Sequence, residues 1–223
     1  MKNWMIACFA ILGFMLTGCI EIIDDLKLNL DGSGTFKYSV NLSSSKVKIN
    51  SILALDTLDG QKVPSKEEIK EKISNFKFNL SQKKGISNVI IEEDFTNYIF
   101  KISCDFDDLS SLQTAIKRTI SDLVSHQKNE FDEHEWITWD GNTLERSVPQ
   151  IAMEQINKLK KEDIELLKSG SYTCISRFDK EIKSCENPAS VISKNKRAAM
   201  LRINTYDLSK NVDMLHNKIT LID

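Results

Sequence analysis

Apolar and polar residues alternate along much of the chain, beginning shortly after residue 20. The alternation runs through residues 22–30 and 34–42 and is interrupted by Asp31-Gly32-Ser33-Gly34. An Asp-Gly pair between two alternating runs is a strong hairpin signal, because glycine adopts positive φ without a side-chain clash. The pattern predicts two antiparallel strands, whose apolar faces carry Leu26, Leu28 and Leu30 in the first and Phe36, Tyr38 and Val40 in the second.

A helical spacing replaces the alternation between Ser65 and Lys84. Apolar residues recur there at intervals of three or four, which places them on one face of a helix. Ser65 and Glu68 match a capping box, and Gly85 suits the residue after a helix end. The segment is therefore predicted as an amphipathic helix, with an apolar stripe of Ile69, Ile73, Phe76 and Leu80.

Residues 108–125 and 150–168 have the same helical spacing, the second with more charges. Strands joined as hairpins and interleaved with helices favour an α+β fold, with antiparallel β-hairpins and about three amphipathic helices packed on the sheet. The other apolar runs are short and predict strands at 89–95, 98–106, 135–139, 143–147, 172–178, 189–193, 198–206 and 218–222.

The N-terminus has a different pattern. Lys2 precedes an uncharged run that lasts until Glu21 and has small residues near its end. A positive start, an apolar stretch and small residues are the layout of an export signal. The run is also just long enough for an uncleaved membrane helix, which needs about 20 residues. A third alternative is an ordinary secretory signal in which Cys19, near the end of the run, occurs by chance.

Leu16-Thr17-Gly18-Cys19 at the end of this run resembles the lipobox of bacterial lipoprotein signal peptides. The resemblance implies cleavage between Gly18 and Cys19 and a lipid on Cys19. Two or three acyl chains would hold the protein at a membrane almost permanently, whereas one chain binds only marginally. The expected location is the extracytoplasmic side of the cell membrane or outer membrane. An aspartate directly after the cysteine would indicate retention at the inner membrane in some bacteria. This chain has Ile20 there, which mildly favours the outer membrane.

Removal of residues 1–18 from the chain of 223 leaves 205, which is ample for one hydrophobic core. We expect one extracytoplasmic domain over residues 19–223, with the polar stretch 127–134 as a candidate boundary. A hydrophobic fraction of 41% and a charged fraction of 28% are typical of globular chains. The formal charge of −2 argues against a nucleic-acid partner, which usually requires a strongly basic face.

Three cysteines remain in the expected mature chain besides Cys19, and an odd number cannot pair completely within one molecule. Cys174 and Cys185 are close in sequence and could form a disulfide across a hairpin. The alternative is three buried free thiols, with Cys104 as the third. The cysteines share no ligand spacing with histidine, so no metal site is predicted.

The sequence contains no nucleophile elbow, no P-loop and no dinucleotide-binding fingerprint, so we expect no enzyme and no cofactor. His134 stands among Asp132, Glu133 and Glu135 and would be the first choice for acid–base chemistry in an envelope hydrolase. A solvated polar turn is the alternative interpretation of this stretch.

Two further resemblances concern short segments. Asp56-Thr57-Leu58 resembles the acceptor of the O-glycosylation system of Bacteroidetes, which would place a glycan on Thr57. The cysteine, strand, Asp-Gly turn and second strand of residues 19–42 resemble the LppM-type lipoproteins. That resemblance implies an envelope lipoprotein and no particular ligand.

These observations predict a lipid-anchored, extracytoplasmic envelope lipoprotein that acts without catalysis, as a binding or assembly component. Its partners would be the membrane, through the lipid on Cys19, and an envelope protein or a lipid ligand. The alternatives are an envelope hydrolase and a carrier that holds a lipid or another apolar ligand between the sheet and the helices.

Overall fold

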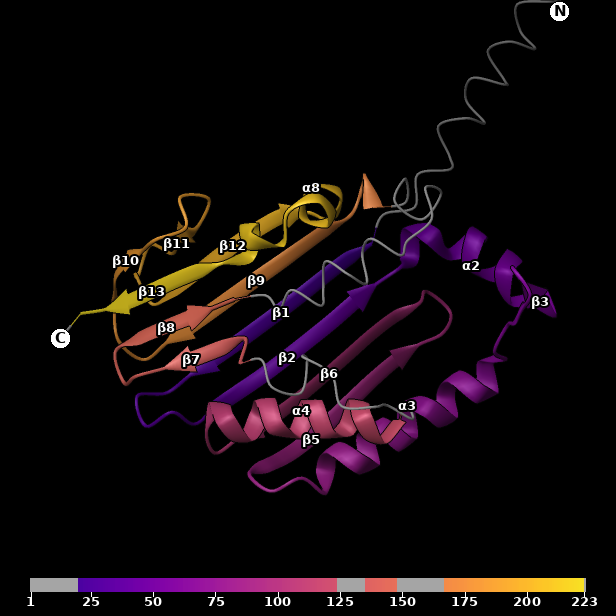
Figure 1. Cartoon of the computed structure of the whole chain (residues 1–223), viewed down its shortest axis with the longest axis horizontal. Coiled ribbons are helices and arrows are strands. Elements are labelled where there is room, and N and C mark those ends of the chain that lie inside the picture. The colour runs from indigo at the N-terminus through magenta and orange to yellow at the C-terminus, as the bar shows by residue number, and fades with distance from the viewer. Residues whose placement is uncertain (1–19, 124–134, 148–166, 223) are drawn as a thin grey trace, which may run out of the picture.

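The computed structural model describes residues 20–123, 135–147 and 167–222, which form a large sheet, a small sheet and helices on one side (Figure 1). The neighbouring strands of the large sheet are antiparallel, except that β1 and β9 run parallel. From edge to edge its seven strands are β11 (Val191–Ile192), β12 (Ala198–Asn204), β9 (Ser171–Phe178), β1 (Glu21–Leu28), β2 (Gly34–Asn41), β6 (Ile99–Phe106) and β5 (Ile86–Asp94).

The predicted hairpin at the start of the chain is confirmed as β1 and β2. Its turn is closed by the Asp31 carboxylate, which accepts hydrogen bonds from the Ser33 backbone N–H at 3.0 Å and hydroxyl at 2.6 Å. Gly32 has φ of +87°, a backbone conformation that residues other than glycine rarely adopt. The turn thereby fixes the register that pairs Leu26 with Phe36.

A second, four-stranded sheet lies over part of one face of the large sheet (Figure 1). Leu26 and Leu28 of β1 share a core cluster with Leu144, Ile219 and Leu221 of the small sheet, and each is at most 1% exposed. The two sheets are therefore joined by a continuous apolar core. In order, the small sheet contains β10 (Ile182–Cys185), β13 (Asn217–Leu221), β8 (Thr143–Arg146) and β7 (Ile137–Trp139).

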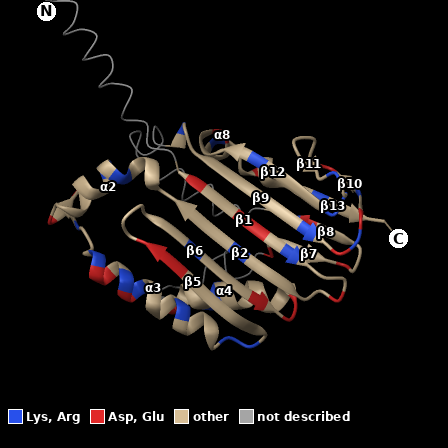
Figure 2. Cartoon of the chain, turned by 180° about the vertical axis from the view of Figure 1, so that it is seen from behind, with Lys and Arg blue, Asp and Glu red and all other residues tan. Residues whose placement is uncertain are grey.

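Helices α3 (Lys66–Ser81) and α4 (Leu109–Leu123) cover the β5 and β6 side of the same face (Figure 1). From behind, no helix of the described residues lies over the middle strands, and the ribbon carries charged residues of both signs along them (Figure 2). The smaller elements are η2 (Ser43–Ser45), α2 (Lys46–Leu53), β3 (Thr57–Leu58), β4 (Gln61–Lys62), α8 (Thr205–Lys210) and η3 (Val212–Leu215).

The α+β class is confirmed, and the helices expected at 65–84 and 108–125 are α3 and α4. The candidate boundary, and all but the last two residues of the third expected helix, lie outside the described residues. The strand expected at 198–206 was too long, because Asn204 caps a helix: its side chain accepts a hydrogen bond from the Tyr206 N–H at 2.8 Å. The sequence pattern also missed α2, the β3–β4 hairpin and β10.

The capping box of α3 is present as predicted. The Ser65 hydroxyl accepts a hydrogen bond from the Glu68 N–H at 3.1 Å, and the Glu68 carboxylate accepts one from the Ser65 N–H at 2.7 Å. These bonds satisfy two donors that the first helical turn leaves without intrahelical partners.

Ser65→Ala should lower the free energy of unfolding by about 1 kcal/mol, because it removes the cap of a helix that packs on the sheet. Ser74→Ala, at an exposed position of the same helix, is the control and should raise stability by a few tenths of a kcal/mol. Urea unfolding monitored by circular dichroism measures both changes. Equal effects of the two substitutions would contradict the role of Ser65.

Candidate functional site

A cavity of about 630 Å³ lies between the large sheet, the two long helices and the small sheet. Most of the described side chains around it are aliphatic or aromatic. Those from the helices are Phe76, Leu80, Ile116, Ile120, Leu208, Val212 and Leu215; those from the strands and adjoining residues are Phe36, Ile102, Cys104, Trp136 and Ile137, with Asp24, Tyr38, Arg146, Ser147, Tyr172 and Cys174 as the polar members.

The helical part of the wall follows from the spacing of apolar residues in the sequence. Phe76 and Leu80 of α3 are four residues apart, as are Ile116 and Ile120 of α4, so each pair lies on one helical face. Both pairs line the cavity. The apolar stripes thus identify the inner faces, but part of each face borders a cavity.

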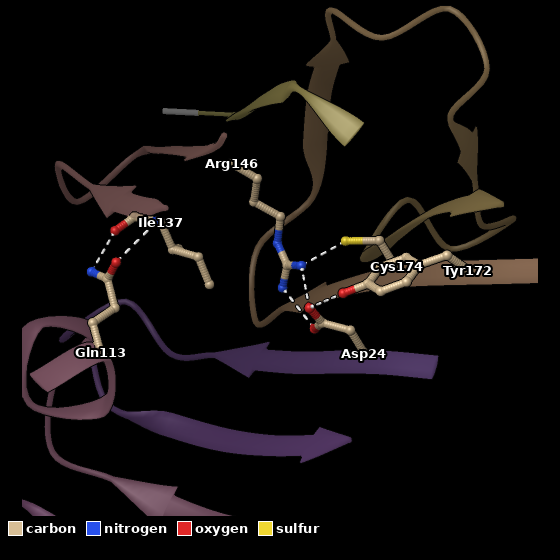
Figure 3. A network of polar contacts seen from close by, with 6 residues as sticks. All are labelled: Asp24, Gln113, Ile137, Arg146, Tyr172 and Cys174. Carbon is tan, nitrogen blue, oxygen red and sulfur yellow. Dashed lines mark hydrogen bonds and ion pairs between the residues drawn. The ribbon is translucent and has the colours of Figure 1, made fainter. Parts of the chain in front are cut away.

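Gln113 of α4 joins the helix to the small sheet beside the cavity (Figure 3). Its side-chain amide donates to the Ile137 carbonyl at 2.8 Å and accepts from the N–H groups of Trp136 at 2.9 Å and Ile137 at 3.2 Å. Gln113 is 5% exposed, and these bonds satisfy its buried amide. The contact positions Trp136 at the cavity wall.

The polar members gather where three strands of the large sheet lie side by side. In the register of the sheet Asp24 of β1 pairs with Tyr38 of β2 on one side and with Cys174 of β9 on the other. All three side chains lie on the inner face and line the cavity. Asp24 therefore places a carboxylate within an otherwise largely apolar interior.

Arg146, the last residue of β8, reaches this carboxylate from the small sheet (Figure 3). Its NH1 and NH2 groups donate to the two Asp24 oxygens at 3.1 and 3.2 Å. NH1 also donates to the Cys174 sulfur, and the Tyr172 hydroxyl donates to Asp24 at 3.2 Å. The side chains of Arg146 and Asp24 are only 8% and 12% exposed, so the ion pair is buried.

Burial keeps the neighbouring acidic groups in their protonated forms. Desolvation, with a contribution from Asp24, raises the pKa of Tyr38 to about 12 and that of Tyr172 well above its ordinary value. Desolvation also raises the pKa of the Cys174 thiol to about 11, although Arg146 acts in the opposite direction. The cavity therefore presents neutral phenols and a neutral thiol beside the ion pair of Asp24 and Arg146 at physiological pH.

The sequence did not identify Asp24, Arg146 or Tyr172 as site residues. A signal existed for Asp24, because it interrupts the apolar face of its strand two positions before Leu26. No local signal existed for Arg146, whose partner lies 122 positions away in the chain.

The predicted lipidation and cleavage site at Gly18 and Cys19, and His134, lie outside the described residues. Thr57 is exposed in β3, so its glycosylation stays a prediction. Among the described residues there is no cluster of three or more potential metal ligands. No helix within the described ranges has the length and hydropathy needed to cross a bilayer.

The described cysteines follow the free-thiol alternative. Cys104, Cys174 and Cys185 are all unpaired, the first two buried and the third half-buried. The disulfide between Cys174 and Cys185 is not formed, because β9 and β10 belong to different sheets and Cys174 contacts Arg146 instead.

Alkylation should distinguish these thiols. Burial raises the pKa of Cys104 and Cys174 to about 11, so little of the reactive thiolate exists at neutral pH and both should react only after unfolding. Cys185 should react first in the folded protein. Mass spectrometry after iodoacetamide treatment without reductant measures this order. Absence of labelling at Cys174 and Cys185 even in denaturant would contradict it and indicate a disulfide.

Arg146→Gln should lower the free energy of unfolding by about 3–5 kcal/mol, because it leaves the Asp24 carboxylate buried without its counter-ion. Arg177→Gln is the matched control. Arg177 binds Asp25, the next residue of β1 on the opposite face, but its side chain is 49% exposed. That substitution should cost no more than about 1 kcal/mol. Equal losses in urea unfolding would contradict the distinction between the two pairs.

Comparison with known proteins adds one structural likeness. No protein-family model matches the chain, and no curated protein matches it. The chain is similar to the folded domain of LppM from Mycobacterium tuberculosis, solved by NMR, with 11% sequence identity, 92% of each chain covered and a TM-score of 0.42.

Proposed function

We propose that this protein binds an apolar ligand of the lipid class in the cavity and acts as a binding or carrier component of the bacterial envelope. The cavity itself is the observation that carries the proposal. Its volume of about 630 Å³ lies within the roughly 300–1,000 Å³ of typical ligand sites. Predominantly apolar walls with a few convergent polar groups are the usual composition of such sites.

The surroundings of the cavity support a binding role. Its walls come from α3, α4 and both sheets, so the fold holds it open by packing elements that are distant in sequence. A protein interior is normally filled to high density, and an apolar space of this size leaves many side chains without contacts on one side. An apolar ligand would supply those contacts.

Attachment to a membrane is the second part of the proposal and rests on Leu16-Thr17-Gly18-Cys19. If Cys19 carries the lipid, the tether is short, because β1 begins at Glu21 and the Ile20 carbonyl already accepts a hydrogen bond from the Ser171 N–H at 2.8 Å. The cavity would then remain close to the extracytoplasmic surface of the cell membrane or outer membrane, where lipid ligands are available.

We favour binding over catalysis. The thiol of Cys174 and the phenols of Tyr38 and Tyr172 have raised pKa values, so they stay protonated at neutral pH and little thiolate or phenolate is present to act as nucleophile or base. An envelope hydrolase that uses His134 is the alternative function, and assembly with an envelope protein through the outer surface is another. A positive hydrolase assay that is lost in His134→Ala would favour the first of these.

Occupation of the cavity can be tested with Nile red, a neutral apolar dye. Residues 20–223, which contain every element described above, should bind it with increased fluorescence. Ile116→Trp places a large ring in the cavity and should weaken binding at least about tenfold. Ile90→Trp on the outer face, where Ile90 is 55% exposed, is the control and should bind like the parent protein. Equal weakening by both, or none by either, would contradict a ligand site in this cavity.

A further inference from the structure

The charges of the described residues that line the cavity sum to zero. Of the described residues that line it, only Asp24 and Arg146 are charged, and they are bonded to each other. Both Asp24 oxygens accept from the Arg146 guanidinium, and one of them also accepts from Tyr172. The positive charge of Arg146 is therefore already neutralised before a ligand enters.

The polar group left to a ligand is uncharged. The Tyr38 hydroxyl lines the cavity beside Asp24 and makes no hydrogen bond to another described residue. A hydroxyl of this kind can donate to a carbonyl oxygen or exchange bonds with an alcohol. The polar end of the cavity is thus built to satisfy a neutral hydrogen-bonding group.

Among the described lining residues, an anionic head group would find no free counter-ion in this position. A carboxylate placed there would lie near the Asp24 carboxylate, whose side chain is only 12% exposed, and an unpaired charge in such buried surroundings is costly. An ester or a hydroxyl of the same size avoids that cost. The difference distinguishes two ligands that carry the same acyl chain.

We propose that the cavity selects neutral acyl lipids, such as acylglycerols or other fatty esters, over free fatty acids, with the uncharged ester or hydroxyl group at Tyr38. This inference rests on the proposed function, since it names the ligand class of the same site. The Asp24–Arg146 pair then determines specificity. It adds polarity to the cavity wall, but its cation is already paired and cannot bind a ligand anion.

Displacement of Nile red by monopalmitoylglycerol and by palmitate, above neutral pH so that palmitate is ionised, tests the selection. The glycerol ester should bind at least about tenfold more tightly to residues 20–223. Palmitate binding that equals or exceeds ester binding would overturn the inference while leaving the proposed function intact. Failure of Nile red and both lipids to bind would overturn the proposed function as well.

Charge variants show whether Asp24 prevents the Arg146 cation from binding a ligand anion. Asp24→Asn leaves the Arg146 cation without a partner, so palmitate should bind at least about tenfold more tightly than it does to the parent protein. The double variant Asp24→Asn/Arg146→Gln has no net charge and should again favour the ester. Asp25→Asn, on the opposite face of the same strand, is the control and should leave both affinities unchanged.

Circular dichroism establishes that each variant is folded before its affinities are compared. If Asp24→Asn does not fold, the comparison of the two lipids on the parent protein still decides whether the cavity selects the ester. An unchanged preference in a folded Asp24→Asn protein would overturn the role of the ion pair.

Discussion

The buried ion pair between Asp24 and Arg146 is the interaction on which the arrangement of the site depends. Asp24 lies in the middle of the large sheet and Arg146 at the end of a strand of the small sheet, and the bond between them joins the two layers beside the cavity. Apolar contacts could hold the sheets together without it. The pair instead fixes one particular polar arrangement, in which Tyr172 and Cys174 also take part.

Burial of this ion pair costs free energy that a purely apolar core would avoid. Burying two charges removes their hydration, and apolar residues of similar volume often stabilise a core equally well. The Arg146 Nε group is buried without a hydrogen-bond partner among the described residues, which adds to the cost. Departures of this kind from a purely apolar core tend to occur at functional sites. The position of the pair on the wall of a largely apolar cavity agrees with that rule.

Local patterns predicted the elements well and their partners poorly. The Asp-Gly turn and the capping box at Ser65 are encoded within a few residues, and both are present as expected. The parallel pairing of β1 with β9 joins segments far apart in the chain and has no local signature. If each strand paired only with its neighbour in the sequence, Asp24 and Cys174 would lie in different hairpins. Their position side by side in the large sheet therefore could not be predicted from the sequence. Apolar periodicity likewise showed which faces of α3 and α4 point inward, but not that a cavity lies beneath Phe76 and Ile116.

Whether the cavity is occupied in the cell is best determined by native mass spectrometry of the chain, purified gently from a bacterial envelope extract and compared with its denatured mass. A neutral acyl lipid held in the folded protein and released on denaturation is the predicted result. Identical native and denatured masses, at a protein purity that would reveal a single bound lipid, would contradict the account and direct attention to protein partners.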